Sequence, residues 1–480
     1  MHEQLSASLE RLDMDKIGCY LIHNPEYYLM DAINRGAPKD ERLDEMYARL
    51  QEAFVGLEEE VKNGRIGSYG ISSNSFSLEH TSDKFLPYED LGLIVVDEEH
   101  DDSYKSDQKP RVNIKDLSIY MGKKFGIQVI LGSATPSLAS FYKIPYFRLK
   151  KTFFDSEKQI TFINSNLELS NPIINKIVQT LANQNQVIIF LPTRANFKYQ
   201  ICKSCGKSIE CPFCSVSLSL HKNNNALQCH YCYYTQPITK FCPHCKTGTI
   251  ESFRLGTAQV VEELQNIFPD KVIQKFDRDS IKTDKELKKV IKNFNENKID
   301  ILVGTQMLSK GHDYHNVKLA VVLGIDSVLN MSSYKVREKA LSLLVQIAGR
   351  SGRKGYGEVV VQTKNGEFFN HYLQISDYED FLKKELQTRV DLYPPYLKLS
   401  RVVFSHTNHT IAKEHLDRYV QIFSNQKEVE IVGFGESGVF KIANKYRYEL
   451  LLRSSNPSKL ISLLHSIKSP YASIDMDSLY

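Results

Sequence analysis

The chain has 480 residues, of which 42% are hydrophobic and 25% are charged, a composition typical of a globular protein with domains of roughly 150 residues. No apolar run approaches the roughly 18 residues that cross a bilayer, and the charged N-terminus has no apolar signal core. These features favour a cytoplasmic protein by default, whereas the net charge of +4 is uninformative about partners by itself.

Four stretches of the first 76 residues carry a resemblance to a known family: Ser8–Leu12, Tyr20–Glu26 (YLIHNPE), Leu57–Ile66 (LEEEVKNGRI) and Tyr69–Asn74 (YGISSN). Together they resemble the middle of an aldo-keto reductase, which would make His23 a member of that family's catalytic set. The Asp, Tyr and Lys that complete the set are not supplied, and a quarter of a barrel leaves open sheet edges. Reductase activity is therefore not expected, and His23 is interpreted as a half-buried histidine at a strand end.

The charge balance changes after this segment. Residues 1–76 hold 8 Lys/Arg and 14 Asp/Glu, a net charge of −6, and the remainder has a net charge of +10. This shift predicts a seam between unrelated segments within residues 74–84, which a gene fusion, an in-frame deletion or an assembly error would produce.

Short apolar runs alternate with helical patterns from residue 91 onward. The runs at 91–96 and 127–132 are typical of strands buried on both faces of a parallel sheet, and each ends in polar residues. Further strands are expected at 187–191, 300–303 and 319–323, with helices at 283–296 and 334–348. This alternation predicts an α/β architecture with functional residues at the carboxyl ends of strands.

Eight of the nine cysteines form four C-x2-C pairs within residues 202–245. Each pair presents two sulfurs to one ion and two pairs complete a closed tetrahedral shell, so the sequence predicts two structural zinc ions rather than disulfides or a catalytic metal. Spacing alone allows a nested or a sequential pairing of these four pairs. Residues 198–254 carry seven basic and two acidic side chains. This basic excess could contact nucleic-acid phosphates, but an ordinary solvated surface explains it equally well.

From about residue 396 the pattern changes to a small α+β domain. Strands are expected at 401–406, 429–434 and 446–453, and helices at 409–424 and 457–467. A split β-α-β arrangement fits this order.

Four polar segments are typical of an ATP-driven motor. They are Asp97-Glu98-Glu99-His100, Gly132-Ser133-Ala134-Thr135-Pro136, Gly304-Thr305-Gln306-Met307 with Lys310-Gly311-His312-Asp313, and Gln346-Ile347-Ala348-Gly349-Arg350-Ser351-Gly352-Arg353. In the first segment Asp97 is expected to hold Mg²⁺ and Glu98 to orient the attacking water. In order and character the four resemble motifs II, III, V and VI of superfamily 2 helicases.

With eight cysteines inserted, residues 82–480 resemble the PriA family of primosomal helicases, truncated at the N-terminus. The resemblance implies a partial first and a complete second RecA-like lobe, a two-zinc module and an α+β C-terminal domain. The expected domains are residues 1–76, 77–155, 156–395 with the zinc insertion at 198–254, and 396–480.

The same resemblance implies particular site residues. Arg350 and Arg353 would be arginine fingers. The nucleotide would also contact Gln346, Gly304, Thr305 and Asp313. The nested pairing would place Cys202, Cys205, Cys242 and Cys245 on one zinc ion and Cys211, Cys214, Cys229 and Cys232 on the other.

The implied activity is ATP- and Mg²⁺-dependent 3′→5′ unwinding of branched or single-stranded DNA. The implied partners are primosome proteins and single-strand-binding protein, and a nucleoid-associated monomer is expected.

One departure from the family limits this expectation. Such helicases carry G-x-x-x-x-G-K-[ST] before the acidic strand end, and the 480 residues contain no match. The nearest match, Gly206-Lys207-Ser208, is a false positive, because Ile201 stands where the motif has its first glycine. We therefore expect negligible ATP hydrolysis, and the alternative is a non-enzymatic, zinc-containing DNA- and protein-binding fragment or chimera.

Overall fold

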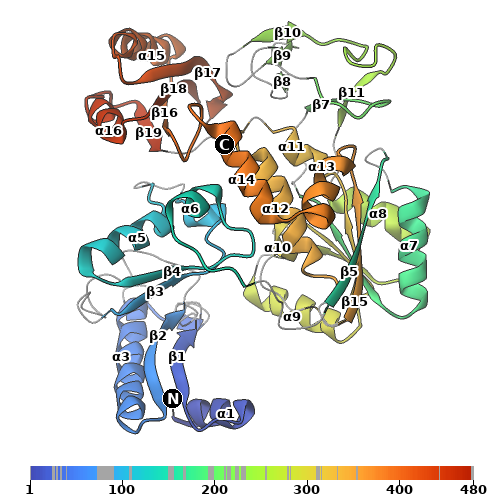
Figure 1. Ribbon diagram of the computed structural model, residues 1–480, viewed down its shortest axis with the longest axis vertical. Helices are drawn as coiled ribbons and strands as arrows, with labels where there is room; N and C mark the ends of the chain where they lie inside the picture. Colours follow the sequence, from blue (N-terminus) through green and yellow to red (C-terminus); the bar gives the residue numbers. More distant parts are fainter. Residues whose placement is uncertain are drawn as a thin grey trace. The chain divides into compact units, whose positions relative to one another are not determined.

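The structure is a computed structural model, and its chain divides into two compact units, residues 1–132 and 133–480 (Figure 1). The described residues are 2–23, 28, 31–32, 35–38, 41–72, 91–106, 111–149, 156–165, 169–192, 199–209, 212, 218–221, 226–228, 234–253, 257–277, 280–281, 283–309, 314, 316–331, 333–352, 355–442 and 444–476.

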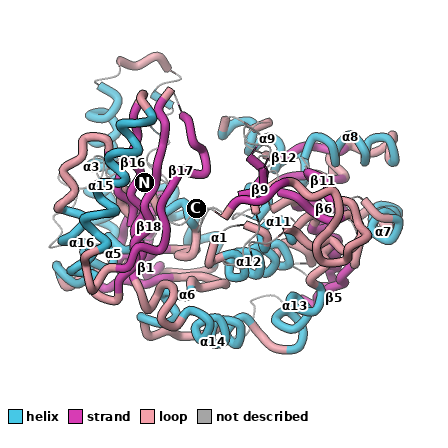
Figure 2. Tube along the Cα trace, turned by 90° about the horizontal axis from the view of Figure 1, so that it is seen from above, coloured by secondary structure: helices cyan, strands magenta, loops and turns pink. Residues whose placement is uncertain are grey.

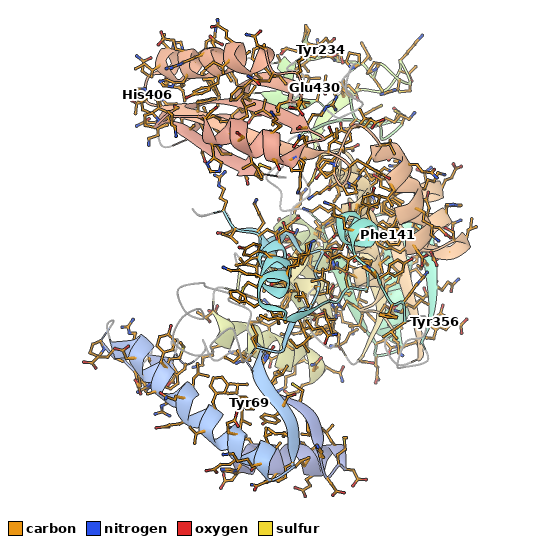
Figure 3. The ribbon with its side chains drawn as sticks, turned by 60° about the vertical axis from the view of Figure 1, so that its left-hand side comes forward. Tyr69, Phe141, Tyr234, Tyr356, His406 and Glu430 are labelled. Atoms are coloured by element: carbon orange, nitrogen blue, oxygen red, sulfur yellow. The ribbon has the colours of Figure 1, made fainter. Side chains whose placement is uncertain are left out.

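The first unit begins with a β-α-β segment. Its elements are α1 (His2–Leu12), β1 (Ile17–His23), α3 (Glu41–Lys62) and β2 (Ile66–Ser72). The two strands pair in parallel, so α3 is the crossover helix between them. Leu50, Phe54 and Leu57 form the buried stripe of α3, and the ring of Phe54 lies 5.5 Å from that of Tyr69. Figure 3 labels Tyr69 on β2.

A second, separate two-stranded sheet completes this unit. It consists of β3 (Leu93–Val96) and β4 (Gln128–Leu131), paired in parallel, with η1 (Asp102–Tyr104) and α5 (Ile114–Phe125) between them. The side chain of Asn113 accepts a hydrogen bond from the Asp116 N–H at the start of α5. Gly122 allows α5 to approach the sheet closely, since a Cβ there would lie 2.5 Å from Cγ2 of Val129.

The second unit is built on a six-stranded, entirely parallel sheet with the order β12-β13-β6-β14-β15-β5. The strands are β5 (Ser156–Ile163), β6 (Gln186–Phe190), β12 (Ile273–Phe276), β13 (Ile301–Gly304), β14 (Val317–Val322) and β15 (Gly355–Gln362). Every residue of β6 and β13 is buried, as expected for central strands of a parallel sheet.

Helices cover both faces of this sheet (Figure 1). One face packs against α7 (Asn171–Ala182) and α8 (Thr257–Ile267). On the other face, the apolar cluster contains side chains of α9 (Asp284–Asn295), α10 (Gln306–Ser309), α11 (Asp326–Leu329), α12 (Val336–Ala348), α13 (Gly366–Asn370) and α14 (Tyr378–Arg389), and α6 (Leu138–Lys143) packs against α14. A short π-helical turn, His371–Ile375, follows α13.

The cysteine-rich segment is inserted between β6 and β12. It forms a five-stranded sheet with the order β10-β9-β8-β7-β11, all neighbours antiparallel. The strands are β7 (Tyr199–Cys202), β8 (Ser219–His221), β9 (Ala226–Gln228), β10 (Thr235–Pro237) and β11 (Ile250–Phe253).

The C-terminal part has the element order of a split β-α-β domain, as the sequence predicted. Its elements are β16 (Lys398–His406), α15 (His409–Ser424), β17 (Glu430–Ile442), β18 (Lys445–Ser454), α16 (Pro457–His465) and β19 (Ala472–Met476). The sheet order is β17-β18-β16-β19, with β16, β17 and β18 side by side in Figure 2. Both helices pack on one face of the sheet.

The predicted α/β architecture is confirmed, but two local predictions are wrong. The runs at 91–96 and 127–132 do form strands, yet Val95 of β3 and Ile130 of β4 are exposed, because none of the described helices of this unit covers that face of the small sheet. His23 ends β1 as predicted, but it is exposed rather than half-buried, with Nδ1 3.4 Å from Oγ of Ser72. Among the described helices, none has the length and apolar character to cross a membrane.

Candidate metal centre and helicase motif residues

The outer two cysteine pairs lie in turns of the same shape. The Cys202 carbonyl accepts a hydrogen bond from the Gly206 N–H at 2.9 Å, and the Cys242 carbonyl accepts one from the Lys246 N–H at 2.9 Å. In both turns the residue after the second cysteine has a left-handed backbone, with φ of 70° at Gly206 and 62° at Lys246. These turns aim both sulfurs of a pair to the same side.

The pairing of β7 with β11 brings the two turns together. Cys202 lies opposite Ile250, and the four sulfurs of Cys202, Cys205, Cys242 and Cys245 lie within 4.8 Å of one another. The Sγ atoms of Cys202 and Cys245 are 3.5 Å apart, and those of Cys205 and Cys242 are 3.7 Å apart. A tetrahedron with zinc–sulfur bonds of about 2.3 Å requires sulfurs roughly 3.8 Å apart. The cluster therefore fits a closed, four-thiolate zinc site.

Backbone N–H groups point at these sulfurs and favour the thiolate form. The Gly248 N–H donates to Sγ of Cys245 at 3.3 Å, and the Gly248 and Thr247 N–H groups lower the pKa of Cys245 to about 6. Burial raises the pKa of Cys205 to about 12. In the metal-free chain Cys245 is therefore the first of the two thiols to be ionised, and a bound cation would be needed to ionise the other.

The cysteine-rich module is held by the residue that follows α11 and by the C-terminal sheet. Oγ of Ser208 donates to Oδ1 of Asn330 at 3.1 Å, next to the turn of the first pair. An apolar cluster joins the module to the C-terminal sheet; its buried members are Ile209, Leu218, Leu227, Leu399 and Leu451. The inner cysteines, Cys211, Cys214, Cys229 and Cys232, lie outside the described residues.

The acidic strand end of the first unit forms a compact turn. The Glu98 N–H donates to Oδ1 of Asp97 at 2.9 Å, and the Tyr104 hydroxyl donates to the Asp97 carbonyl at 2.6 Å. The carboxylate of Asp97 is exposed, so it is accessible to a divalent cation. Glu99 is buried and accepts from Nζ of Lys115 at 2.8 Å, a pair that the sequence did not indicate.

The motif residues of the second unit lie at two different edges of its sheet. Gly304 ends β13 at the carboxyl edge, where a Cβ would lie 2.2 Å from the Phe276 carbonyl, and the buried Thr305 follows it. Arg350 lies beyond the end of α12, and the next two residues bond to the first residues of β14 at the amino edge. The structure does not bring Thr305 together with Arg350. Asp313 and Arg353 lie outside the described residues.

One face of α12 holds the segment after Gly132 by hydrogen bonds that the sequence did not indicate. Oγ atoms of Ser342 and Thr135 lie 2.7 Å apart, and Ser342 also accepts from Nε2 of Gln346 at 3.1 Å. One turn earlier, Oε1 of Glu338 accepts from the Leu138 N–H at 2.9 Å. Residues 338, 342 and 346 are spaced four apart, and this spacing places their side chains on one face of a helix.

Three family models match the chain. They are the PriA DNA helicase Cys-rich region domain at residues 211–237, the helicase conserved C-terminal domain at 241–355, and the aldo/keto reductase family at 1–84. The last match covers the segment with the reductase resemblance.

Two curated relatives, both named "Replication restart protein PriA", are similar over most of the chain. The one from Helicobacter pylori (strain ATCC 700392 / 26695) is 45% identical over 402 residues, which are 82% of this chain and 64% of the relative. The one from Bacillus subtilis (strain 168) is 32% identical over 411 residues, 81% of this chain and 50% of the relative. The chain thus spans half to nearly two thirds of the length of these relatives.

Among solved structures, the DUF1998 helicase MrfA bound to DNA overlaps with a TM-score of 0.39 at 14% identity, covering 79% of this chain and 46% of that chain. That overlap is too weak to support a conclusion. Over about four fifths of its length, the chain is a homologue of these two replication restart proteins PriA.

Proposed function

We propose that this chain acts in replication restart, binding branched or single-stranded DNA and assembling a primosome. The main support for this proposal is the 45% identity to a PriA protein over 402 residues. The aligned part includes the match to the helicase C-terminal domain and the four clustered cysteines. Primosome proteins and single-strand-binding protein are the proposed partners of a nucleoid-associated monomer in the cytoplasm.

Two structural zinc ions belong to this proposal. The outer ion binds Cys202, Cys205, Cys242 and Cys245, whose sulfur spacing supports it. The inner ion binds Cys211, Cys214, Cys229 and Cys232, in the nested arrangement. Neither ion takes part in catalysis, because a shell of four thiolates leaves no position open for water.

We propose that the residues of the helicase motifs form a phosphoryl-transfer site. Asp97 holds Mg²⁺ and Glu98 orients water, while Arg350 and Arg353 stabilise charge on the transferred phosphate. Gln346, Gly304, Thr305 and Asp313 are the proposed nucleotide contacts. The 480-residue sequence contains no match to the phosphate-binding loop, so we propose that ATP hydrolysis and 3′→5′ unwinding are impaired.

A second candidate is a non-enzymatic scaffold that binds DNA and proteins through the zinc module and the C-terminal domain. The missing phosphate loop favours it, because DNA binding does not require hydrolysis. Reductase activity is not proposed.

Fork-DNA affinity at a series of salt concentrations tests the DNA-binding claim. A surface that contacts phosphates releases counterions, so log K should fall linearly with log salt, by about 0.9 for each phosphate contact on duplex DNA. Fluorescence anisotropy with zinc-loaded and zinc-stripped protein gives the measurement. Absence of salt-dependent binding by the zinc-loaded chain would refute the proposal.

A further inference from the structure

The acidic turn after β3 contains a left-handed residue that the surrounding structure must hold in place. Glu98 has φ of 48°, a backbone region that is unfavourable for a residue with a side chain. The Asp101 N–H donates to the Glu98 carbonyl at 2.8 Å, and the Glu99 N–H donates to the Gly132 carbonyl at 3.0 Å. The residue that follows Glu98 therefore fixes the turn against the end of β4.

Glu99 also fixes the turn through its side chain. The Glu99 carboxylate accepts a hydrogen bond from Nζ of Lys115 at 2.8 Å, and the two side chains are only 2% and 13% exposed. Lys115 is the second residue of α5, which begins after the N-cap Asn113. This buried salt bridge therefore ties the acidic turn to the first turn of a capped helix.

Stability of α5 does not explain a lysine at this position. Positive side chains are unfavourable in the first turn of a helix, because the positive end of the helix dipole lies there. A buried ion pair also adds little net stability compared with a well-packed apolar pair of similar volume. A directional hydrogen bond, in contrast, fixes where both partners lie. The pair of Glu99 and Lys115 is therefore better explained by the geometry that it maintains than by its contribution to stability.

The group whose geometry depends on this turn is the exposed carboxylate of Asp97. Its Oδ1 accepts from the Glu98 N–H at 2.9 Å, so its direction follows the backbone of Glu98. The carboxylate also lies beside the end of β4, because a Cβ at Gly132 would be 3.6 Å from Oδ1. Carboxylate oxygens are suitable ligands for Mg²⁺, so this side chain fits such an ion.

We propose that Lys115 is a positioning residue for a divalent cation at Asp97 and that it acts through Glu99. This inference rests on the proposed function of Asp97 as a Mg²⁺ ligand. The salt bridge from Lys115 holds Glu99, Glu99 holds the left-handed turn, and the turn keeps the Asp97 carboxylate directed outward. A direct electrostatic role of Lys115 would have the opposite sign, because an ammonium group repels a nearby cation.

The test uses the zinc-loaded 480-residue chain and Fe²⁺, which in the presence of ascorbate and peroxide cleaves the backbone beside its binding site. We expect cleavage next to Asp97 that Mg²⁺ suppresses and that Asp97→Asn abolishes. The double variant Glu99→Met with Lys115→Met keeps the net charge but should need roughly 10 to 100 times more Fe²⁺ for the same cleavage. The matched control is the same double exchange at Lys176 and Glu358, a pair 2.8 Å apart in the second unit, which should leave the cleavage unchanged.

Two further measurements separate positioning from folding. The melting temperature of the double variant should stay close to that of the unchanged protein, because apolar side chains replace the buried pair. Lys115→Arg keeps the salt bridge, so this variant should be cleaved as the unchanged protein is.

A double variant that does not fold would show that the pair is structural, and unchanged cleavage in a folded double variant would show that Asp97 is positioned without it. Loss of cleavage in Lys115→Arg would show that the salt bridge is not what matters. Each of these results overturns this proposal alone. Cleavage that is absent, or that is indifferent to Asp97→Asn, would overturn the proposed role of Asp97 as well, so the two failures are distinguishable.

Discussion

At the scale of single residues, the four outer sulfurs are not equivalent to the isolated Cys19. Cys242 is 2% exposed and its sulfur lies 3.7 Å from that of Cys205, whereas Cys19 is exposed on β1. Cys242→Ser should remove about one zinc ion per chain, because a three-sulfur site binds zinc far more weakly. Elemental analysis of the purified variant gives the count. Cys19→Ser is the control, and an unchanged zinc content in Cys242→Ser would contradict the outer site.

Gly248 is a second residue on which the cluster depends. A Cβ at this position would lie 2.3 Å from Sγ of Cys202, so Gly248→Ala should force the sulfurs apart. We expect zinc affinity to fall roughly 10- to 100-fold, the range for disturbed support of a metal site. Competition with a chromogenic chelator measures it. Thr247→Ala, in the same turn, keeps its backbone N–H and should bind zinc as the unchanged protein does.

At the scale of elements, α14 carries two glutamates whose ionisation has opposite effects on the stability of the folded protein. Burial raises the pKa of Glu385, near Arg337 and Arg389, whereas the hydrogen bond from Lys383 lowers the pKa of Glu379. Glu385 therefore contributes stability that is present below its unfolded pKa and is lost as pH rises through its folded pKa. Glu379 contributes stability that is present above its unfolded pKa and is lost as pH falls through its folded pKa.

The two Glu→Gln variants test this sign. Relative to the unchanged protein, Glu385→Gln should gain melting temperature as pH rises above about 4.3, the usual pKa of glutamate. Glu379→Gln should lose melting temperature over the same range, with the loss fading at acidic pH. Thermal denaturation at half-unit steps from about pH 4 to 7.5 measures both. Parallel curves for the two variants would show that the surroundings of these carboxyls are assigned wrongly.

Strands that are buried on both sides could be predicted from the sequence, whereas several edge strands could not. The apolar runs at 187–191, 300–303 and 319–323 became the central strands β6, β13 and β14, which are buried on both sides. The strands that were missed include β5 (SEKQITFI), β12 (IQKF) and β19 (ASIDM), each at an edge of its sheet. Edge strands carry polar residues because one side is open to water, so they lack the apolar run by which buried strands are recognised.

The candidate site was predictable in kind but not in arrangement. Four C-x2-C pairs indicated zinc ligands, but which pairs meet depends on the pairing of β7 with β11, about 50 residues apart. The hydrogen bond between Thr135 and Ser342 spans 207 residues and has no local signal. Contacts of this range depend on the folded sheet, which spacing along the chain does not encode.

At the scale of the whole molecule, the missing phosphate loop leads to a simple kinetic expectation. We expect the chain alone to hydrolyse ATP at a background rate on fork DNA, because its sequence contains no loop to position the phosphates and neutralise their charge. If so, Asp97→Asn should hydrolyse ATP at the same rate as the unchanged chain. A coupled assay on zinc-loaded protein measures both. Hydrolysis that depends on Asp97 in the chain alone would contradict the impairment.

The order of strands in the large sheet has a consequence for synthesis. β5 is the first of these strands to leave the ribosome, yet its described partner is β15, which is the last. Residues 156–163 must therefore wait for residues 355–362, while the whole cysteine-rich insertion emerges between them. Pairing at such separation is slow and leaves apolar segments exposed to aggregation in the meantime. Nascent chains arrested before residue 355 should thus remain bound to chaperones, however much zinc the cell provides.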